Sequence, residues 1–185
     1  MPLQSGSVDS SYPWCVHVRL ATDADAEAIE RIRIRGWQIA YRHVFRADEL
    51  DRLPIDASRW RHNLVEPPRG NAAFVAEQDG RVLGWALVGP SRDVQGAGEL
   101  YGLYVDPDMW SRGVGRALIR TAEERLAEEY DEATLWVLDD NPRARRFYEL
   151  AGWADDGGRS QFERRGFSAP QVRYRKRLTR ARSRA

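Results

Sequence analysis

The chain has 185 residues, which is enough for one domain with a substantial buried core and too few for two domains of ordinary size. Hydrophobic residues make up 42% of the chain and charged residues 31%, a composition that excludes a disordered protein. The formal net charge is only +1, so the molecule lacks the overall positive charge of nucleic-acid-binding proteins, and no nucleic-acid partner is expected.

We expect no targeting signal in the N-terminal residues. Residues 1–14 are polar, which predicts a flexible tail and not a signal peptide. The single cysteine, Cys15, excludes an intramolecular disulfide, and no metal site is expected. No stretch approaches the roughly 20 apolar residues of a membrane span, so we expect a cytoplasmic protein with no membrane partner. A single domain over 15–179 and a basic flexible tail at 180–185 complete the predicted organisation.

The first predicted elements are a short strand and two helical regions. Residues 16–20 are suited to a strand. A helix follows over about 22–41, because polar residues at its start can cap it and apolar residues recur along one side. A second, weaker helical region at 48–64 is interrupted by Pro54.

A hairpin and a third strand come next. Residues 72–78 and 81–89 are apolar runs joined by Asp79 and Gly80, a pair typical of a two-residue hairpin turn. After a polar loop, residues 99–105 form another predicted strand, which Asp-Pro ends.

Two strand-to-helix units then follow each other. Residues 114–129 place apolar side chains on one side and charged ones on the other, which indicates an amphipathic helix. Residues 133–138 are continuously apolar, as in a strand that is buried on both faces. Asn141 and Pro142 begin the last helix as N-cap and first helical residue, and Gly152 ends it.

The chain closes with two strands, predicted at 160–165 and 171–178. Antiparallel hairpins are thus combined with strand-to-helix units, which predicts a mixed sheet flanked by helices. The predicted fold class is α/β (α+β): a central, mostly antiparallel sheet of six to seven strands with about four helices.

The segment between the strand at 99–105 and the amphipathic helix has the composition of a phosphate-binding loop. Gly113 and Gly115 let the backbone approach a ligand, and the helix N-terminus adds partial positive charge. Arg112 and Arg116 add full charges. Together these groups suit a pyrophosphate.

Other phosphate loops fit this segment less well. A Walker loop needs Gly-Lys-Ser/Thr, whereas Arg116 and Ala117 follow the last glycine. A dinucleotide fingerprint needs a small residue where Leu118 stands. A glycine-rich helix start with two surface arginines is the remaining alternative.

Two segments resemble the motifs of one enzyme family. Residues 103–118, Leu-Tyr-Val-Asp-Pro-Asp-Met-Trp-Ser-Arg-Gly-Val-Gly-Arg-Ala-Leu, resemble the acetyl-CoA signature of the GNAT superfamily of N-acetyltransferases. Residues 141–153, Asn-Pro-Arg-Ala-Arg-Arg-Phe-Tyr-Glu-Leu-Ala-Gly-Trp, are similar to its second motif, Asn-x-x-Ala-x-x-Phe-Tyr-x-x-x-Gly-Phe. The resemblance covers 72–178, with one departure: Trp110 stands where the family commonly has glutamine.

The resemblance implies a GNAT-like fold and an N-acetyltransferase that uses acetyl-CoA as its acetyl donor, with no metal and no covalent enzyme intermediate. The amide-rich pantetheine would pair with the strand at 103–105 like an extra strand. The residues that the resemblance implies for acetyl-CoA binding are Leu103, Tyr104, Val105, Arg112, Gly113, Val114, Gly115, Arg116, Asn141, Ala144 and Tyr148.

Acetylation of an amine needs a proton acceptor, because neutralising an ordinary alkylamine at pH 7 costs roughly 4–5 kcal/mol. Glu99 is the first candidate, since the resemblance puts it at the offset of the catalytic glutamate in the histone-acetylating branch. A solvated glutamate at a strand end is the alternative interpretation. Asp139 and Asp140 are the next candidates, and His43 is a weaker one.

The other two tasks concern the thioester. Tyr148 is the candidate acid for the departing thiolate, because this tyrosine faces the CoA sulfur in the resembling motif; a packed core aromatic is the alternative. Backbone groups of 103–105 are implied for the developing oxyanion, because the family breaks this strand with a bulge.

The acceptor is left open by the sequence. Trp37, Tyr41, His43 and Phe45 cluster where the first helix ends, which suits either a cationic amine or plain packing. The C-terminal arginines suit either an anionic partner or a solvated strand face and tail. Aminoglycosides, polyamines, amino acids and protein amines all remain as acceptors. A homodimer is one alternative for the assembly. The second function class is a non-catalytic sensor domain that binds acyl-CoA.

Overall fold

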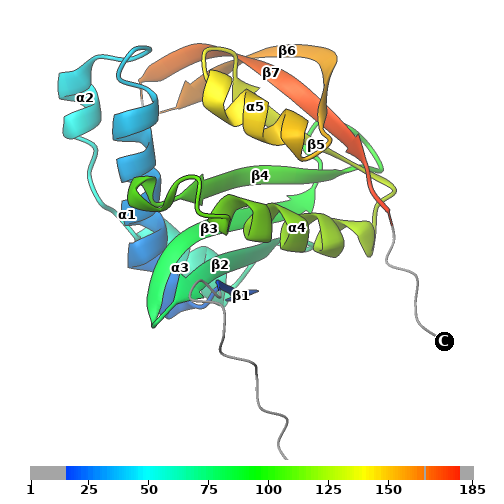
Figure 1. The fold of residues 1–185 in the computed structure, drawn as a ribbon, viewed down its shortest axis with the longest axis horizontal. Helices are drawn as coiled ribbons and strands as arrows, with labels where there is room; N and C mark the ends of the chain where they lie inside the picture. The colour runs from blue at the N-terminus through cyan, green and yellow to red at the C-terminus, as the bar shows by residue number, and fades with distance from the viewer. Residues whose placement is uncertain (1–15, 165, 180–185) are drawn as a thin grey trace, which may run out of the picture.

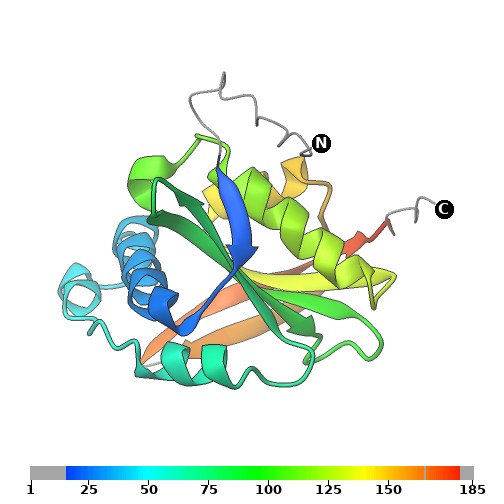
Figure 2. The ribbon, with the colours of Figure 1, turned by 90° about the horizontal axis from the view of Figure 1, so that it is seen from below.

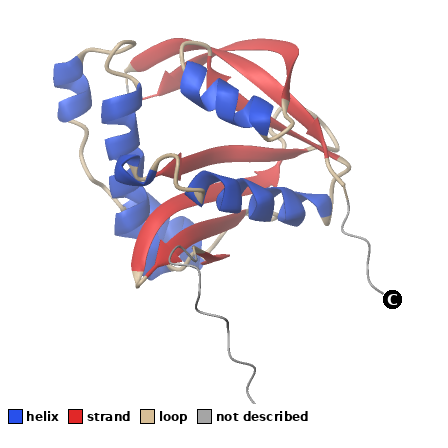
Figure 3. Cartoon of the chain, in the orientation of Figure 1, coloured by secondary structure: helices blue, strands red, loops and turns tan. Residues whose placement is uncertain are grey.

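The computed structural model describes residues 16–164 and 166–179. These residues form a seven-stranded sheet with the order β1-β2-β3-β4-β5-β7-β6. Figure 3 shows helices lying against the strands of this sheet. Every neighbouring pair is antiparallel except β4 and β5. The strands are β1 (His17–Leu20), β2 (Ala72–Gln78), β3 (Arg81–Pro90), β4 (Gly98–Val105), β5 (Glu132–Leu138), β6 (Ala154–Arg164) and β7 (Phe167–Arg177). The helices are η1 (Asp23–Asp25), α1 (Ala26–Ala40), α2 (Ala47–Asp51), α3 (Ser58–Val65), η2 (Pro107–Met109), α4 (Val114–Ala127) and α5 (Pro142–Leu150).

The predicted mixed, mostly antiparallel sheet flanked by helices is confirmed. The predicted tails at 1–14 and 180–185, and Cys15, lie outside the described residues. Among the described residues, no helix combines the length and apolarity needed to cross a membrane.

Helices cover both faces of the sheet (Figures 1 and 2). On one face lie α4 and α5, with α4 burying Val114, Leu118, Ala122 and Leu126 along the stripe that the sequence predicts. On the other face α1 and α3 pack against Val75 and Trp85. The side of the sheet to which a strand residue points its side chain therefore determines which helices that side chain contacts.

The hairpin turn between β2 and β3 is as predicted. Asp79 and Gly80 both have positive φ, at 52° and 74°, which is the conformation of a type I′ turn. The strand after it is less regular. Val88 pairs with Leu100 while Leu87 pairs with Gly102, so Tyr101 is an extra residue and forms a bulge in β4.

The two central strands separate beyond this bulge. The parallel pairing of β4 with β5 covers only Gly98–Leu100 against Ala133–Leu135. Past Leu100, β4 pairs with β3 alone, and past Leu135, β5 pairs with β7 alone. The facing edges of β4 and β5 consequently offer backbone N–H and C=O groups that no neighbouring strand satisfies.

The last hairpin is longer than predicted, because β6 and β7 have 11 residues each. Its first residues, Asp-Asp-Gly-Gly at 155–158, have the composition of a turn. In the structure they form a bulge inside β6: pairing with β7 jumps from Asp155 to Arg159, and Gly157 takes a φ of 85°. The predicted strand start at residue 160 was therefore wrong.

The helical regions before the hairpin divide further than predicted. The first begins as the 3-10 turn η1 before α1. The second forms two helices, α2 and α3, and Pro54 lies between them, as predicted for the interruption.

Candidate active site

A cavity of about 1030 Å³ lies where β4 and β5 separate. It is bounded by β4, the loop before α4, α5, the end of α1, the start of α3, the loop between β3 and β4, and parts of β5, β6 and β7. Most of the residues predicted to bind acetyl-CoA line it, namely Leu103, Tyr104, Val105, Gly113, Gly115, Arg116, Asn141, Ala144 and Tyr148. Arg112, Val114 and Glu99 do not belong to the lining.

The loop before α4 has the backbone shape of an anion site. Ser111 and Gly113 have positive φ, at 63° and 86°, and Gly113 is the N-cap of α4. Such left-handed residues next to a helix start turn successive N–H groups toward one point. A Cβ on Gly113 would meet nothing within 4 Å, whereas one on Gly115 would lie 3.3 Å from the ring of Phe147. Val114 buries its side chain in the core, so only its N–H is available to a ligand.

A buried carboxylate anchors this loop to the rest of the fold. Asp106 is 5% exposed and accepts bonds from Arg35 at 2.6 Å, from Arg81 at 3.0 Å and from the N–H of Asp108 at 3.1 Å. The chain is thereby held where β4 ends and η2 begins.

Trp110, the departure from the family motif, adds a second anchor. Its indole Nε1 donates to the backbone oxygen of Val105 at 3.0 Å, so it uses one acceptor near the open edge of β4. The guanidinium of Arg143 lies over the indole ring at 4.1 Å from the ring centre and also lines the cavity. Sequence reasoning missed Arg143, because only the fold brings α5 beside Trp110.

Asn141 joins α5 to α1. Its side-chain oxygen accepts from the N–H of Ala144 at 3.0 Å, which is the N-cap predicted from the sequence. Its amide nitrogen donates to the hydroxyl of Tyr41 at 3.1 Å. Asn141 is only 8% exposed, so this link is part of the cavity wall and not a surface contact.

Tyr148, the candidate acid, lies on α5 with its side chain 7% exposed. Burial raises the pKa of its phenol well above the ordinary value, and the neighbouring Tyr104 adds to the shift. The phenol therefore stays protonated at neutral pH, as a hydrogen-bond donor must. No hydrogen bond to this hydroxyl is made by the described residues, although Phe147 and Trp153 pack against the ring.

Glu99, the first candidate base, is 1% exposed and lies outside the cavity lining. Its carboxylate accepts from the backbone N–H of Arg92 at 3.0 Å, from the Nε of Arg92 at 3.1 Å and also from Nη2. Arg92 itself does line the cavity. Arg92 thus contacts both the cavity and the carboxylate of Glu99, and the base role of Glu99 stays a prediction.

The other candidate bases also lie outside the lining. Asp139 accepts from Arg145 at 2.5 Å. Asp140 is exposed, and its backbone oxygen is 2.9 Å from the Nε2 of His43. This pair joins α5 and the segment after α1 at the surface.

The predicted aromatic cluster divides between packing and the cavity wall. Trp37 and Tyr41 line the cavity, and the indole of Trp37 donates to the hydroxyl of Tyr104 at 3.0 Å. Phe45 stacks on Trp37 with ring centres 6.0 Å apart and lies outside the lining, as does His43.

Two arginines of β7, Arg173 and Arg175, are paired within the fold. Arg173 and Arg175 both bind Asp156, at 2.9 Å and 3.0 Å, and Arg173 also binds Asp93 at 3.0 Å. These contacts agree with a strand face and leave no evidence there for an anionic partner.

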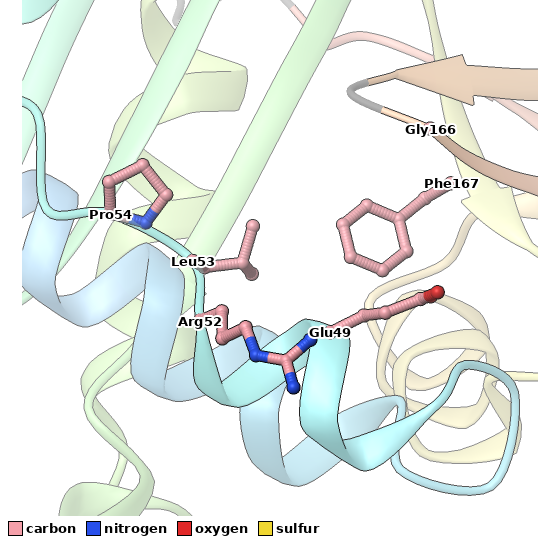
Figure 4. A pocket seen from close by; sticks show the side chains of 6 residues that line it. All are labelled: Glu49, Arg52, Leu53, Pro54, Gly166 and Phe167. Carbon is pink, nitrogen blue, oxygen red and sulfur yellow. The ribbon is translucent and has the colours of Figure 1, made fainter.

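A second hollow of about 540 Å³ lies between α2 and the β6–β7 hairpin. Figure 4 shows Phe167 of the hairpin facing Leu53 and Pro54 across it. It holds no cluster of groups suited to catalysis. In the described ranges, no three His, Cys, Asp or Glu side chains gather where they could hold a metal ion.

Comparisons with known proteins agree on one family. Residues 29–153 match the model of the acetyltransferase (GNAT) family. An uncharacterized N-acetyltransferase of Bacillus subtilis, YuaI, is 30% identical over 69% of this chain and 74% of its own length. The S-(2-succino)cysteine N-acetyltransferase of the same organism is 24% identical over 75% of this chain and 84% of its own. Matches to mycothiol acetyltransferases cover much less of those proteins, 28% for the one from Acidimicrobium ferrooxidans.

The fold is shared with solved structures. The PaiA N-acetyltransferase of Thermoplasma acidophilum, in complex with coenzyme A, superposes with a TM-score of 0.70. The match covers 89% of this chain and 100% of the other at 16% identity.

Proposed function

Since the chain belongs to the acetyltransferase (GNAT) family and is an acetyl-CoA-dependent N-acetyltransferase, we propose that it passes the acetyl group directly to a primary amine bound in the same ternary complex. One observation carries this proposal: the cavity between β4 and β5 has the glycine-rich loop before α4 at one end, and α1 together with Arg59 of α3 lines a second wall. Donor and acceptor can therefore approach from opposite faces of the sheet.

The donor fits the α4 and α5 side of the cavity. The pyrophosphate would lie at the N-terminus of α4, where backbone N–H groups of 113–115 and the cationic Arg116 are available. The pantetheine amides would pair with the free edge of β4 at 103–105. Arg143, held over Trp110, adds a further positive charge beside the phosphates.

The acetyl transfer needs a stabiliser for the oxyanion, a donor to the leaving sulfur and an acceptor for the amine proton. The amine nitrogen forms a bond to the acetyl carbon, the carbon–sulfur bond breaks, and the amine loses one proton. Backbone N–H groups at the open edge of β4 would stabilise the negative oxygen of the tetrahedral intermediate, because no neighbouring strand pairs with this edge. The hydroxyl of Tyr148 donates to the departing sulfur.

Burial refines the role of Tyr148. A thiol has a pKa near 8.5, and burial moves the pKa of the Tyr148 phenol upward from its ordinary value. Complete proton transfer from the phenol to the thiolate is therefore uphill. We infer that Tyr148 stabilises the leaving group mainly through a hydrogen bond, and that solvent completes the protonation.

The proton acceptor in this proposal is Glu99. The amine proton would reach it through a water molecule or after a movement of Arg92, because Arg92 covers the carboxylate. Asp139 and Asp140 are the alternatives, although neither lines the cavity.

The experiment is a measurement of CoA release with a panel of amines, combined with initial-rate kinetics in both substrates. Direct transfer predicts intersecting double-reciprocal lines and no acetylated enzyme by intact mass. Parallel lines together with an acetylated enzyme would overturn the direct mechanism.

The second function class is a sensor that binds acyl-CoA without transfer. It predicts tight acetyl-CoA binding and no product with any amine. Tyr148 in the cavity wall favours the enzyme, because binding of the donor does not need a phenol beside the sulfur.

A further inference from the structure

Positive charge is not confined to the donor side of the cavity. Six arginines line it, against a single acidic residue, Glu163. The arginines of α4 and α5 belong to the donor side, where the phosphates of acetyl-CoA account for them. On the acceptor side the lining contains Arg59 of α3, Arg92 of the loop between β3 and β4, and Arg164 of β6.

Arg92 is held in a fixed position by buried partners. Its Nε and Nη2 bind the carboxylate of Glu99, which is 1% exposed, whereas the side chain of Arg92 is 66% exposed. Its guanidinium carbon lies 4.8 Å from the ring centre of Tyr101, and the hydroxyl of Tyr101 donates to the oxygen of Pro90 at 2.6 Å. The described residues offer Nη1 no hydrogen-bond partner. Arg92 thus resembles a preorganised donor whose remaining edge is available to a ligand.

Glu99 neutralises the positive charge of Arg92 in part, and Arg59 adds a further positive charge to the cavity. Arg59 lies at the start of α3. Both arginines line one cavity, and Arg59 has no ion-pair partner among the described residues, so this cavity attracts anions and repels cations.

We propose that Arg92, supported by Arg59, binds a carboxylate of the acceptor, so that the acceptor is a small amine that also carries a carboxylate. This inference rests on the proposed function, whose acceptor it specifies. Polyamines and aminoglycosides fit less well, because their several positive charges would face both arginines. A bidentate guanidinium contact favours a planar carboxylate over a spherical anion.

The strand spacing limits the size of the acceptor. Tyr101, under Arg92, is the bulge residue two positions before Leu103, so the Cα atoms of the two residues are at most about 7 Å apart along β4. The acetyl group is expected at 103–105, so the amine and the carboxylate are separated by only a few bonds. A free amino acid or a close derivative meets this requirement.

The test compares acids with their amides as acceptors. The standard L-amino acids, β-alanine and taurine are each measured for kcat and KM, and the carboxylic acids are paired with their C-terminal amides. The amide has the less basic amine and so the larger neutral fraction at pH 7, which makes it intrinsically more reactive. We expect at least one acid to exceed its amide about tenfold or more in kcat/KM, the effect of one charged hydrogen bond.

Two variants assign this preference to the arginines. Arg92→Lys keeps a charge beside Glu99 and so preserves the fold, but it loses the second donor edge. Arg59→Ala removes an unpaired side chain and leaves no buried charge behind. Each should raise KM for the acid about 5- to 50-fold with kcat less affected, so that the ratio of kcat/KM for the acid to kcat/KM for its amide, both measured on the same variant, falls. Arg31→Ala, which breaks an exposed ion pair on α1 outside the cavity, is the matched control and should leave both substrates unchanged.

The outcomes separate the two proposals. Equal use of acids and amides by the wild type, or an acid preference that survives in both variants, overturns the carboxylate site but leaves the acetyltransferase standing. Preference for taurine over the carboxylic acids also overturns it, in favour of a sulfonate. No product with any amine, including polyamines, aminoglycosides and peptides, overturns the proposed function and this inference together.

Discussion

A substitution at Tyr148 can distinguish a catalytic role of its hydroxyl from a packing role of its ring. Tyr148→Phe keeps the ring between Phe147 and Trp153 and removes only a hydroxyl to which no described residue is bonded. Because the hydroxyl acts on a thiolate, which needs little help to leave, we expect kcat to fall about 10- to 100-fold. Acetyl-CoA affinity and melting temperature should stay near the wild-type values, and calorimetry and thermal unfolding measure them.

The opposite result has an equally clear meaning. A core-aromatic role for Tyr148 predicts unchanged kcat and a lower melting temperature. Wild-type kinetics in an assay limited by the chemical step would remove this residue from the mechanism.

Glu99→Gln decides between a base and a support for Arg92. As a base, Glu99 gives a kcat that falls by about 10²–10⁴ at neutral pH and recovers at high pH, where the amine loses its proton unaided. As a support for Arg92, it gives a raised KM for the acceptor and an unchanged pH profile of kcat. Measurement of kcat and KM across pH separates these results, with the exposed Glu27→Gln as control.

Full activity of Glu99→Gln would contradict both roles. The search for the base would then move to Asp139 and Asp140.

The residues of the donor side could be predicted from the sequence because their motif is local. Gly113, Gly115 and Arg116 are neighbours in the chain, and Asn141 caps its own helix. The acceptor side could not be predicted in this way. Arg92 comes from a polar loop and Arg59 from a distant helix, and only the tertiary fold brings both to one cavity.

Phosphate binding by the loop before α4 can be tested with substitutions at two glycines that have similar backbone conformations. Gly113 and Gly80 have φ values of 86° and 74°, and a Cβ on either would meet nothing within 4 Å. Gly113→Asp and Gly80→Asp should therefore cost similar stability. Only Gly113→Asp places a carboxylate where the pyrophosphate is expected, so its acetyl-CoA affinity should fall about 100-fold or more.

Calorimetric titration with acetyl-CoA and a thermal melt of each variant provide the measurement. Equal affinities of the two folded variants would refute the assignment of the phosphate loop.

At the level of elements, the sequence predicts interiors better than boundaries. Strand β2 and the hairpin turn after it follow from an apolar run and from Asp79-Gly80, which are local signals. The start of β6 does not, because 155–158 look like a turn and become a bulge only through pairing with β7. The bulge at Tyr101 likewise depends on the pairing of β4 with β3, and the residue types around it do not predict it.

For the whole molecule, the donor should act as a missing strand between β4 and β5. Acetyl-CoA at 100 times its dissociation constant adds about 2.7 kcal/mol to the free energy of unfolding, or roughly 5–10 °C in melting temperature for a chain of this size. The amides of the free edge of β4 should gain protection from hydrogen exchange, whereas those of β7 should change little.

Differential scanning fluorimetry and exchange mass spectrometry test this expectation. A thermal shift without protection of 103–105 would mean that the donor is held by the phosphate loop alone.

The short parallel pairing also bears on how the protein could be divided. Among the described strands, β1–β4 pair with β5–β7 only through Gly98–Leu100 and Ala133–Leu135, and the two sets are contiguous in sequence, with α4 closing the first. A cut between Ala127 and Glu132 would therefore give two fragments, each with its own antiparallel hairpins. Coexpressed on interacting fusion partners, these fragments should reassemble and recover acetyltransferase activity, and excess acetyl-CoA should favour the reassembled form. The fold would then serve as a split reporter whose signal is the CoA that it releases.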